Sequence, residues 1–325
     1  MLGKLLNKRK CFKLVCGAGN EDAVEVEKLV ALYATAGARY FDLSAREDVV
    51  LAARAGLERA IPRERRAEFC LNVSVGIKGD PHVSKAAIEA SLCTDCGACR
   101  DTCLQRAIVA GGEAHSVNAT RCIGCGACIA ACPTQAISTC SRSTPLEEVL
   151  PPLVKLGLDS IELHAVSDDE AGVTEQWRSI EAKFDGILSL CVDRSRLGDA
   201  QLLARIRSLI AGRKEFSTII QADGAPMSGC DDRHQTTLQA LATAQIVQRA
   251  ELPVFLMLSG GTNSKTAEMA KLFGIEAHGV ALGSYARKIV RDRIERDDFL
   301  ANPALFQEAL VVARDLVDRS LRYMG

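Results

Sequence analysis

Eight of the fourteen cysteines in this chain fall in two runs that share one spacing. The runs consist of Cys93, Cys96, Cys99 and Cys103, and of Cys122, Cys125, Cys128 and Cys132. Both read C-x2-C-x2-C-x3-C, and Pro133 follows the second run, which is the ligand pattern of bacterial ferredoxins. Three thiolates at this spacing can bind three corners of one iron–sulfur cubane. Gly97 and Gly126 allow the tight turns that direct backbone N–H groups at the sulfurs.

The fourth cysteine of each run is expected to bind the other cluster, because it leaves the run along a short helix. We therefore assign Cys93, Cys96, Cys99 and Cys132 to cluster one, and Cys122, Cys125, Cys128 and Cys103 to cluster two. A pair of structural zinc sites is the alternative, but such sites usually pair two C-x2-4-C segments across a longer spacer. Two complete four-cysteine runs favour two [4Fe-4S] clusters. Leu104 follows the first run where proline is usual, which predicts a difference in packing.

Composition narrows the function classes. Aromatic residues make up 4% of the 325 residues and the net charge is −1, so we expect no nucleic-acid partner and no attraction to anionic lipid. No run of about 18 apolar residues is present, which predicts no transmembrane segment. Lys13 interrupts the apolar stretch near the start, so we expect no export signal and a cytoplasmic location.

Short apolar runs outside the cysteine region alternate with helical periodicity, which is typical of a parallel α/β fold. Without residues 85–140 the chain keeps about 270 residues, close to the ~250 of a (β/α)8 barrel. Eight strands are predicted, at residues 12–15, 38–43, 69–75, 158–166, 184–192, 216–222, 252–258 and 275–282. An open α/β sheet is the alternative.

We predict a TIM-like (β/α)8 barrel formed by residues 1–84 and 141–302. A ferredoxin-like domain at residues 85–140 is inserted after the third strand, and a C-terminal helix occupies 303–325. The insertion would then protrude from the C-terminal rim, where barrel enzymes build their active sites.

Helix boundaries follow from capping signals. Gly37 predicts the end of a helix whose apolar residues begin at Val26. Thr144 with Glu147, and Thr236 with Gln239, predict capping boxes. The pair at 151–152, both proline, predicts a break or kink.

Two loops on the expected rim contain small residues. Gly260, Gly261 and Thr262 follow the seventh strand, and Gly283 and Ser284 follow the eighth. Backbone N–H groups at such positions can bind a phosphate, so FMN or another phosphate-bearing ligand is a candidate here. The alternative is that these glycines serve only as turn residues.

A long polar loop at 221–234 follows the sixth strand and is a candidate lid or partner-binding loop. Cys230 and His234 in it are too little to indicate a nucleophile. Asp42 and His164 lie near strand ends and could point inward, although a hydrogen-bonded core role is the simpler reading for such a histidine.

The other six cysteines share no ligand spacing, and free cysteines usually behave as small buried hydrophobes. They are Cys11, Cys16, Cys70, Cys140, Cys191 and Cys230. Among them we expect Cys16, just after the first strand, to face the mouth of the barrel.

Three features together resemble the light-dependent period protein (LdpA) family of cyanobacteria and plastid lineages. They are the opening CFKLVCGAGNED at 11–22, the two cysteine runs, and DGAPMSG at 223–229. The resemblance covers nearly the whole chain and implies an iron–sulfur protein that conveys cellular redox state to the circadian clock. It also implies clock proteins and a clock-input histidine kinase as partners. Of the family's functional residues, only the eight cluster cysteines are carried over, and Cys230 stands where relatives are expected to differ.

Three functions remain open at this stage. The first is a redox sensor or electron carrier whose output is a protein contact, with a quinone or another redox partner as a candidate donor. The second is an oxidoreductase in which the ferredoxin-like domain delivers electrons to FMN or a substrate. The third is an interaction scaffold whose clusters are structural. Whether the chain is an enzyme is therefore undecided by the sequence.

Overall fold

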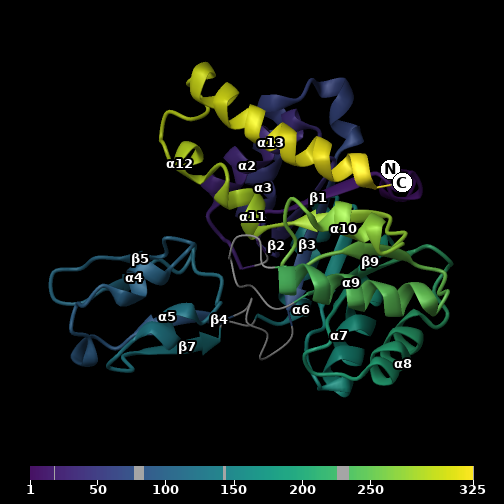
Figure 1. Cartoon of the computed structure of the whole chain (residues 1–325), viewed down its shortest axis with the longest axis horizontal. Helices are drawn as coiled ribbons and strands as arrows, with labels where there is room; N and C mark the ends of the chain where they lie inside the picture. Colours follow the sequence, from purple (N-terminus) through teal and green to yellow (C-terminus); the bar gives the residue numbers. More distant parts are fainter. Residues whose placement is uncertain (18, 77–83, 142–143, 225–233, 325) are drawn as a thin grey trace.

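Eight parallel strands close into a barrel in the order β1-β12-β11-β10-β9-β8-β3-β2, with helices around it (Figure 1). The computed structural model describes residues 1–17, 19–76, 84–141, 144–224 and 234–324. The barrel strands are β1 (Cys11–Val15), β2 (Tyr40–Ser44), β3 (Cys70–Gly76), β8 (Ser160–His164), β9 (Ile187–Val192), β10 (Thr218–Ala222), β11 (Phe255–Leu258) and β12 (Gly279–Leu282). The predicted (β/α)8 barrel is confirmed, and each predicted strand overlaps an observed one.

The helices of this part pack mainly on the outside of the barrel. They are α1 (Leu2–Asn7), α2 (Ala23–Ala36), α3 (Glu47–Ala60), α6 (Leu146–Lys155), α7 (Glu170–Lys183), α8 (Asp199–Ile210), α9 (His234–Arg249), α10 (Thr266–Leu272), α11 (Ser284–Lys288), α12 (Arg291–Ile294) and α13 (Pro303–Tyr323), with a 3-10 segment η1 (Arg63–Glu68). Apolar residues of these helices and of the strands form the larger core.

Helix α1 closes the N-terminal end of the barrel. Its buried Leu2 and Leu6 pack in one cluster with Cys11, Tyr40 and Phe255 of three strands. Each buried leucine contributes about 1.5–3 kcal/mol relative to an exposed one. The amino-terminal end of the barrel is therefore filled with apolar side chains, and the polar groups described below lie nearer the C-terminal rim.

Helix α2 ends where the sequence predicts. The Asp22 carboxylate accepts a hydrogen bond from the Glu25 N–H, which caps the first turn. Gly37 ends the helix with φ of 112°, a left-handed conformation that glycine adopts without strain.

Three local predictions are wrong. Helix α6 begins after Pro145 without a side-chain cap, so Thr144 does not cap it. It continues through Pro151 and Pro152, so the predicted break does not occur, and the alternative of a kink stays a prediction. Burial of its leucines against the core stabilises the continuous form. Thr236 lies inside α9 and not at its start, because its hydroxyl donates instead to the Gly261 carbonyl at 2.8 Å.

A smaller unit lies between β3 and β8 and projects beside the barrel (Figure 1). It consists of β4 (Ser84–Ile88), a 3-10 segment η3 (Ala90–Leu92), α4 (Ala98–Thr102), β5 (Ile108–Val109), β6 (Ser116–Val117), α5 (Ala127–Ala131) and β7 (Ile137–Ser141). Strands β4 and β7 pair antiparallel, as do β5 and β6. The division of the chain at residues 85 and 140 stays a prediction, since 77–83 and 142–143 lie outside the described residues.

Candidate iron–sulfur centre

One group of four cysteines surrounds a pocket in the smaller unit. Cys93, Cys96, Cys99 and Cys132 all line this pocket, which is partly open to solvent. Cys132 belongs to the second sequence run and the other three to the first. The fold therefore places the fourth cysteine of one run among the first three of the other.

The second group likewise combines three cysteines of one run with the fourth cysteine of the other run. Burial and, to a smaller extent, the neighbouring thiols of Cys125, Cys122 and Cys103 together raise the pKa of the Cys128 thiol to about 11. Cys103 comes from the first run, so it too lies among the cysteines of the other run. These raised thiol pKa values apply only without a bound cluster, because a thiol that binds a metal cluster loses its proton.

Corresponding backbone geometry supports the two groups. Gly97 and Gly126 precede α4 and α5 with φ of 80° and 75°. The Ala107 N–H lies 3.3 Å from Cys103 Sγ, and the Ala136 N–H lies 3.3 Å from Cys132 Sγ. N–H groups that point at the sulfurs favour thiolates and tune bound iron–sulfur clusters.

His115 adds a donor that local spacing does not reveal. It lines the pocket of the first group, is 5% exposed, and both of its ring nitrogens lack hydrogen-bond partners among the described residues. Its Nδ1 lies 2.5 Å from an Asp95 carboxylate oxygen, without the angle of a hydrogen bond. The other ring nitrogen, Nε2, is buried beside four thiols, which fits a site that holds a cluster with sulfur acceptors.

The second group lies next to the barrel. Lys85, buried on β4, donates from Nζ to the Cys122 carbonyl at 2.8 Å and to the Gly19 carbonyl at 2.7 Å. Its Nζ also lies 3.1 Å from the Glu21 carboxylate. One buried ammonium group thus joins a ligand residue of the second group to the loop that follows β1.

Further contacts dock the smaller unit on the rim. The Glu21 N–H donates to the Thr120 carbonyl at 2.7 Å. Arg121 pairs with Glu295 at 3.0 Å, and Arg106 pairs with Asp292 at 2.9 Å and also with Glu295. The unit is therefore held on the barrel by polar contacts to the loop after β1 and to α12 with the residue that follows it.

Polar side chains fill the barrel interior above its apolar floor. Lys13 of β1 is fully buried, and its Nζ lies 2.6 Å from Glu162 of β8 and 3.2 Å from Gln221 of β10. The second carboxylate, Asp42 of β2, lies 3.6 Å away and accepts a hydrogen bond from Ser74. Strands β1 and β8 are not neighbours, so these groups meet across the interior.

One ammonium charge faces two carboxylates in this layer. Burial lowers the pKa of Lys13, but Asp42 and Glu162 outweigh burial and the net shift is upward, so Lys13 stays protonated. Burial raises the pKa of Asp42 to about 6, against the opposing effect of Lys13. The interior is therefore charged, unlike the branched apolar filling of most barrels.

The loops predicted to bind FMN or phosphate are packed against their own chain. A side chain at Gly261 would meet the Thr236 side chain at 2.3 Å, and one at Gly260 would meet Asp223 at 2.1 Å. The Thr262 hydroxyl donates to the Ala281 carbonyl. These contacts give the glycines a role in packing.

Helix α11, which Gly283 precedes and Ser284 begins, has five residues. A helix this short has a weak dipole for an anion. The FMN site therefore stays a prediction.

Other predicted positions have different outcomes. Cys16 is fully buried in the larger core, so the expectation that it faces the mouth is wrong. Cys230 lies outside the described residues, as does the side chain of His234. His164 is inward and buried, and it lies beside Cys191 and Asp223, which the sequence did not connect to it.

Comparisons with known proteins agree with this centre. Models of the 4Fe-4S binding domain match residues 90–106 and 115–138, and the model of the light dependent period A C-terminal domain matches 153–319. Light dependent period A of Synechococcus elongatus is 30% identical over 323 residues, covering 94% of this chain and 90% of the relative.

Similar solved structures share low identity. A dihydrodipicolinate synthase from Oceanobacillus iheyensis has a TM-score of 0.41 at 10% identity, covering 97% of this chain and 80% of its own. The YdjI aldolase from Escherichia coli K12 has a TM-score of 0.45 at 8% identity, covering 100% and 97%.

The fold and the cysteine groups define an iron–sulfur protein built on a closed βα barrel. Because the similarity to light dependent period A extends over nearly the whole chain, the chain belongs to the LdpA family. Within the described residues, no helix combines the length and apolar character needed to cross a membrane.

Proposed function

We propose that this chain carries two [4Fe-4S] clusters and conveys cellular redox state to proteins of the circadian clock. The observation that carries the proposal is the pair of four-cysteine groups, each built from both sequence runs, in a unit docked on the barrel rim. Cys93, Cys96, Cys99 and Cys132 would hold cluster one, and Cys122, Cys125, Cys128 and Cys103 cluster two. Bound clusters supply one-electron chemistry at potentials set by charge, hydrogen bonds and exposure.

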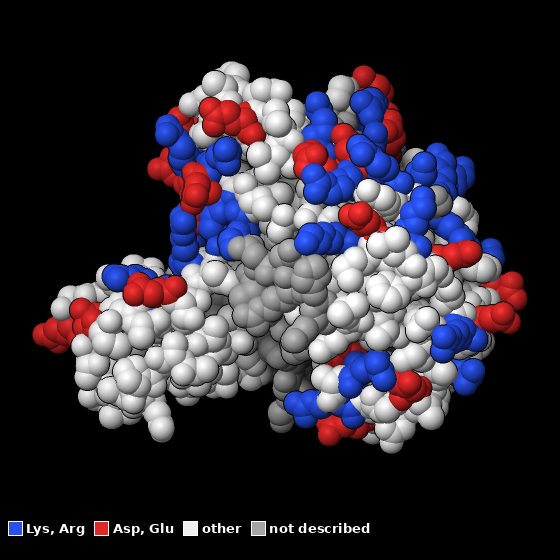
Figure 2. Space-filling model, in the orientation of Figure 1, with Lys and Arg blue, Asp and Glu red and all other residues white. Residues whose placement is uncertain are grey.

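Exposure supports a protein partner as the output. Cys96 and Cys125, one in each group, are exposed, so electrons have a short way to a partner docked there. On the face seen in Figure 2, the ferredoxin-type unit shows few charged side chains, while the helices around the barrel interleave both signs. A face with little charge needs less desolvation on docking than a strongly charged one.

The partners that we propose are those implied by the family resemblance. The relative in Synechococcus elongatus bears the name light dependent period A, which supports oscillator proteins and a clock-input histidine kinase as the first partners to test. A quinone or a redox protein would supply the electrons, and the cytoplasm would be the location.

The test compares binding in two oxidation states. Purified oscillator proteins and the clock-input kinase are titrated, under anaerobic conditions, onto the dithionite-reduced and the oxidised chain. We expect affinities that differ by about tenfold, or ~1.4 kcal/mol. The difference should vanish in the double variant Cys96→Ser/Cys125→Ser, whereas Cys140→Ser, an exposed cysteine outside both groups, should keep it.

Two outcomes would overturn the proposal. Equal binding of both oxidation states would leave the clusters a structural role and favour a scaffold. Release of stoichiometric flavin from the purified chain would favour an oxidoreductase, for which the packing around Gly260 and Gly261 offers no support.

A further inference from the structure

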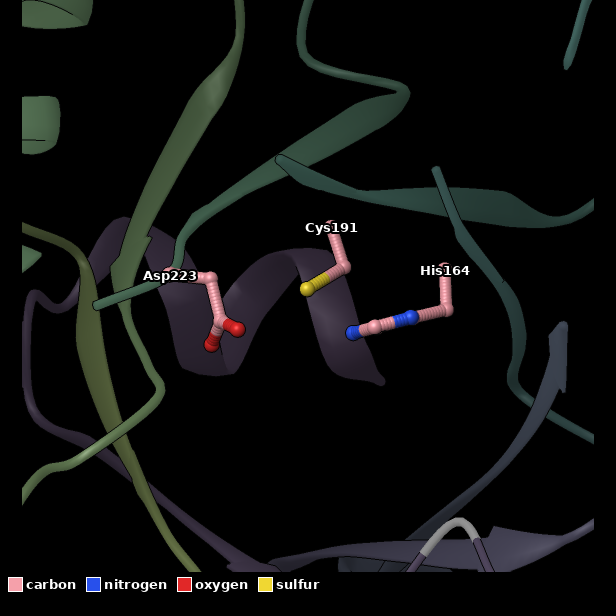
Figure 3. A group of neighbouring side chains, drawn as sticks. All are labelled: His164, Cys191 and Asp223. Carbon is pink, nitrogen blue, oxygen red and sulfur yellow. The ribbon is translucent and has the colours of Figure 1, made fainter. Parts of the chain in front are cut away.

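Three side chains of different chemistry converge at the C-terminal mouth of the barrel. They are His164, Cys191 and Asp223, and one potential ligand atom from each lies within 4.8 Å of the others. Figure 3 shows the Cys191 sulfur between a ring nitrogen of His164 and the Asp223 carboxylate. The cluster is separate from both groups of cysteines in the smaller unit, which uses residues of β4 to β7.

Strand register explains why these residues meet. His164 is the last residue of β8 and pairs with Cys191 of β9, while Asp223 directly follows β10. Side chains alternate along a strand, so residues two apart share a face. Glu162, Ser189 and Gln221 point into the barrel, where Glu162 and Gln221 contact Lys13 and Ser189 contacts Glu162. The residues two positions further along, which are His164, Cys191 and Asp223, therefore form the next interior layer toward the mouth.

The surroundings of this layer carry negative charge. Burial raises the pKa of the Cys191 thiol, and the carboxylates of Asp223, Glu162 and Asp193 raise it further. Burial also raises the pKa of Asp223 to about 7, against the lowering effect of His164. A divalent cation between these side chains would favour the ionised forms of Cys191 and Asp223.

Neighbouring residues hold the Asp223 carboxylate in place. The Ser259 side chain hydrogen-bonds to it. Gly260 passes so close that an added Cβ would lie 2.1 Å from Asp223 Oδ1, and its φ of 58° also favours glycine. Outer partners of this kind orient ligands in metal sites. These contacts give Ser259 and Gly260 a role in positioning the Asp223 carboxylate.

We propose that His164, Cys191 and Asp223 bind one Zn²⁺ ion at the barrel mouth. A thiolate, an imidazole and a carboxylate form a donor set that suits zinc, and three protein ligands leave the fourth tetrahedral position for water or a substrate. Asp223 is half-buried while the other two are buried, so the open position faces the mouth. On binding, the Cys191 thiol gives its proton to solvent and the sulfur bonds to the metal. The site does not depend on the clusters or on their partner.

The experiment uses the anaerobically purified full chain with its iron retained. The chain is washed with a chelator, titrated with Zn²⁺, and measured by metal analysis and zinc-edge X-ray absorption. We expect one zinc per chain with one sulfur neighbour at ~2.3 Å and nitrogen or oxygen neighbours at ~2.0–2.2 Å. Iron content should not change during the titration.

Variants assign the ligands. Cys191→Ser and Asp223→Asn should lose the stoichiometric zinc, and Ser259→Ala should weaken binding by about 10–100-fold. Cys140→Ser, which removes an exposed thiol outside the site, should bind zinc as the unchanged chain does. Because Cys191 is buried, iron content and circular dichroism establish that each variant is folded, and Asp223→Asn tests the site where burial is less complete.

Two kinds of result would contradict the proposed zinc site. Zinc surrounded by four sulfurs would mean that the metal had entered a cluster site. Binding that is unchanged in both Cys191→Ser and Asp223→Asn, or no binding at micromolar zinc, would also overturn the proposal.

Discussion

At the scale of single residues, the charged groups of the barrel interior are arranged around Lys13. Its ammonium group is enclosed by β1, β2, β8 and β10 and faces two carboxylates, of which Glu162 is the nearer. Burial favours the neutral form of the more distant Asp42 and raises the pKa of its carboxyl to about 6, against the opposing effect of Lys13.

The shift at Asp42 predicts a pH dependence of stability. A carboxyl with a folded-state pKa of about 6 and an ordinary value of 3.8 binds its proton more tightly when folded. Its contribution to the free energy of unfolding therefore falls as the pH rises from about 4 to about 6. Asp42→Asn keeps an oxygen that accepts from Ser74 but does not titrate. We expect the variant to gain stability relative to the unchanged chain across this range, measured by urea unfolding at pH 4.5 and pH 7.

Asp48→Asn is the control with the opposite sign. Its hydrogen bonds from Arg46 lower the pKa of Asp48, so this exposed carboxylate contributes stability that is present at neutral pH and lost in acid. The relative stability of this variant should fall slightly as the pH rises. A stability difference for Asp42→Asn that does not change with pH would contradict the assignment of the raised pKa to Asp42.

His115 predicts a specific effect on one cluster. The residue lines the pocket of Cys93, Cys96, Cys99 and Cys132, and its Nε2, which has no hydrogen-bond partner among the described residues, is available to donate to a cluster sulfur. Hydrogen bonds to sulfur raise the reduction potential, because they stabilise the more negative reduced state. In an EPR-monitored redox titration, His115→Leu should lower one of the two potentials and leave the other unchanged. Equal shifts of both, or of neither, would show that His115 does not act on one cluster.

At the scale of elements, the contact between helices α2 and α3 depends on Gly56. A Cβ at Gly56 of α3 would lie 2.5 Å from the Glu27 carbonyl oxygen of α2, so the two helices pack backbone to backbone there. The other nearest atoms are the Ala31 backbone nitrogen and the Val30 Cβ, so no flexible side chain can move to make room.

Gly56→Ala should therefore destabilise the fold although alanine is the better helix former. Overpacking costs about 1–3 kcal/mol, which exceeds the gain in helix propensity of ~1 kcal/mol. Gly3→Ala in α1 is the matched control, since its Cβ would meet Ile187 at an ordinary 3.7 Å. Urea midpoints should fall for Gly56→Ala and stay level or rise for Gly3→Ala. Equal behaviour of the two variants would show that the α2–α3 contact relaxes.

Elements were predictable where the sequence signal is local. Apolar runs located all eight strands, and Gly37 ended α2 as expected. The prolines at 151–152 do not break α6, because burial of Leu150 and Leu153 stabilises a helix that proline alone would interrupt. Thr236 misled because its hydroxyl found a tertiary partner in Gly261.

The candidate sites also differ in how far the sequence could predict them. The cysteine runs carry their own spacing and could be found without a structure. His115 could not, since a hairpin of β5 and β6 brings it to the pocket. His164 and Cys191 lie on two strands and Asp223 directly follows a third, and only strand register and barrel closure bring them together.

At the scale of the whole molecule, the smaller unit is joined to the barrel through buried and half-buried charges. Lys85 connects Cys122 to the loop after β1, and Arg121 pairs with Glu295, which follows α12. This arrangement places the second cysteine group against the barrel and leaves the first group farther out. Electrons that enter at the outer group would therefore reach the barrel through the inner one.

The central claim is that two clusters are each held by cysteines of both runs, and paired variants test it most directly. In a Cys125→Ser background, which lacks cluster two, Cys103→Ser should leave cluster one intact, with about four iron per chain and its EPR signal. In the same background, Cys132→Ser should remove it and leave almost no iron. The Cys96→Ser background should give the reverse pattern. If Cys103→Ser and Cys132→Ser exchange their effects, each run holds its own cluster; if the unchanged chain binds zinc and no iron, the claim fails.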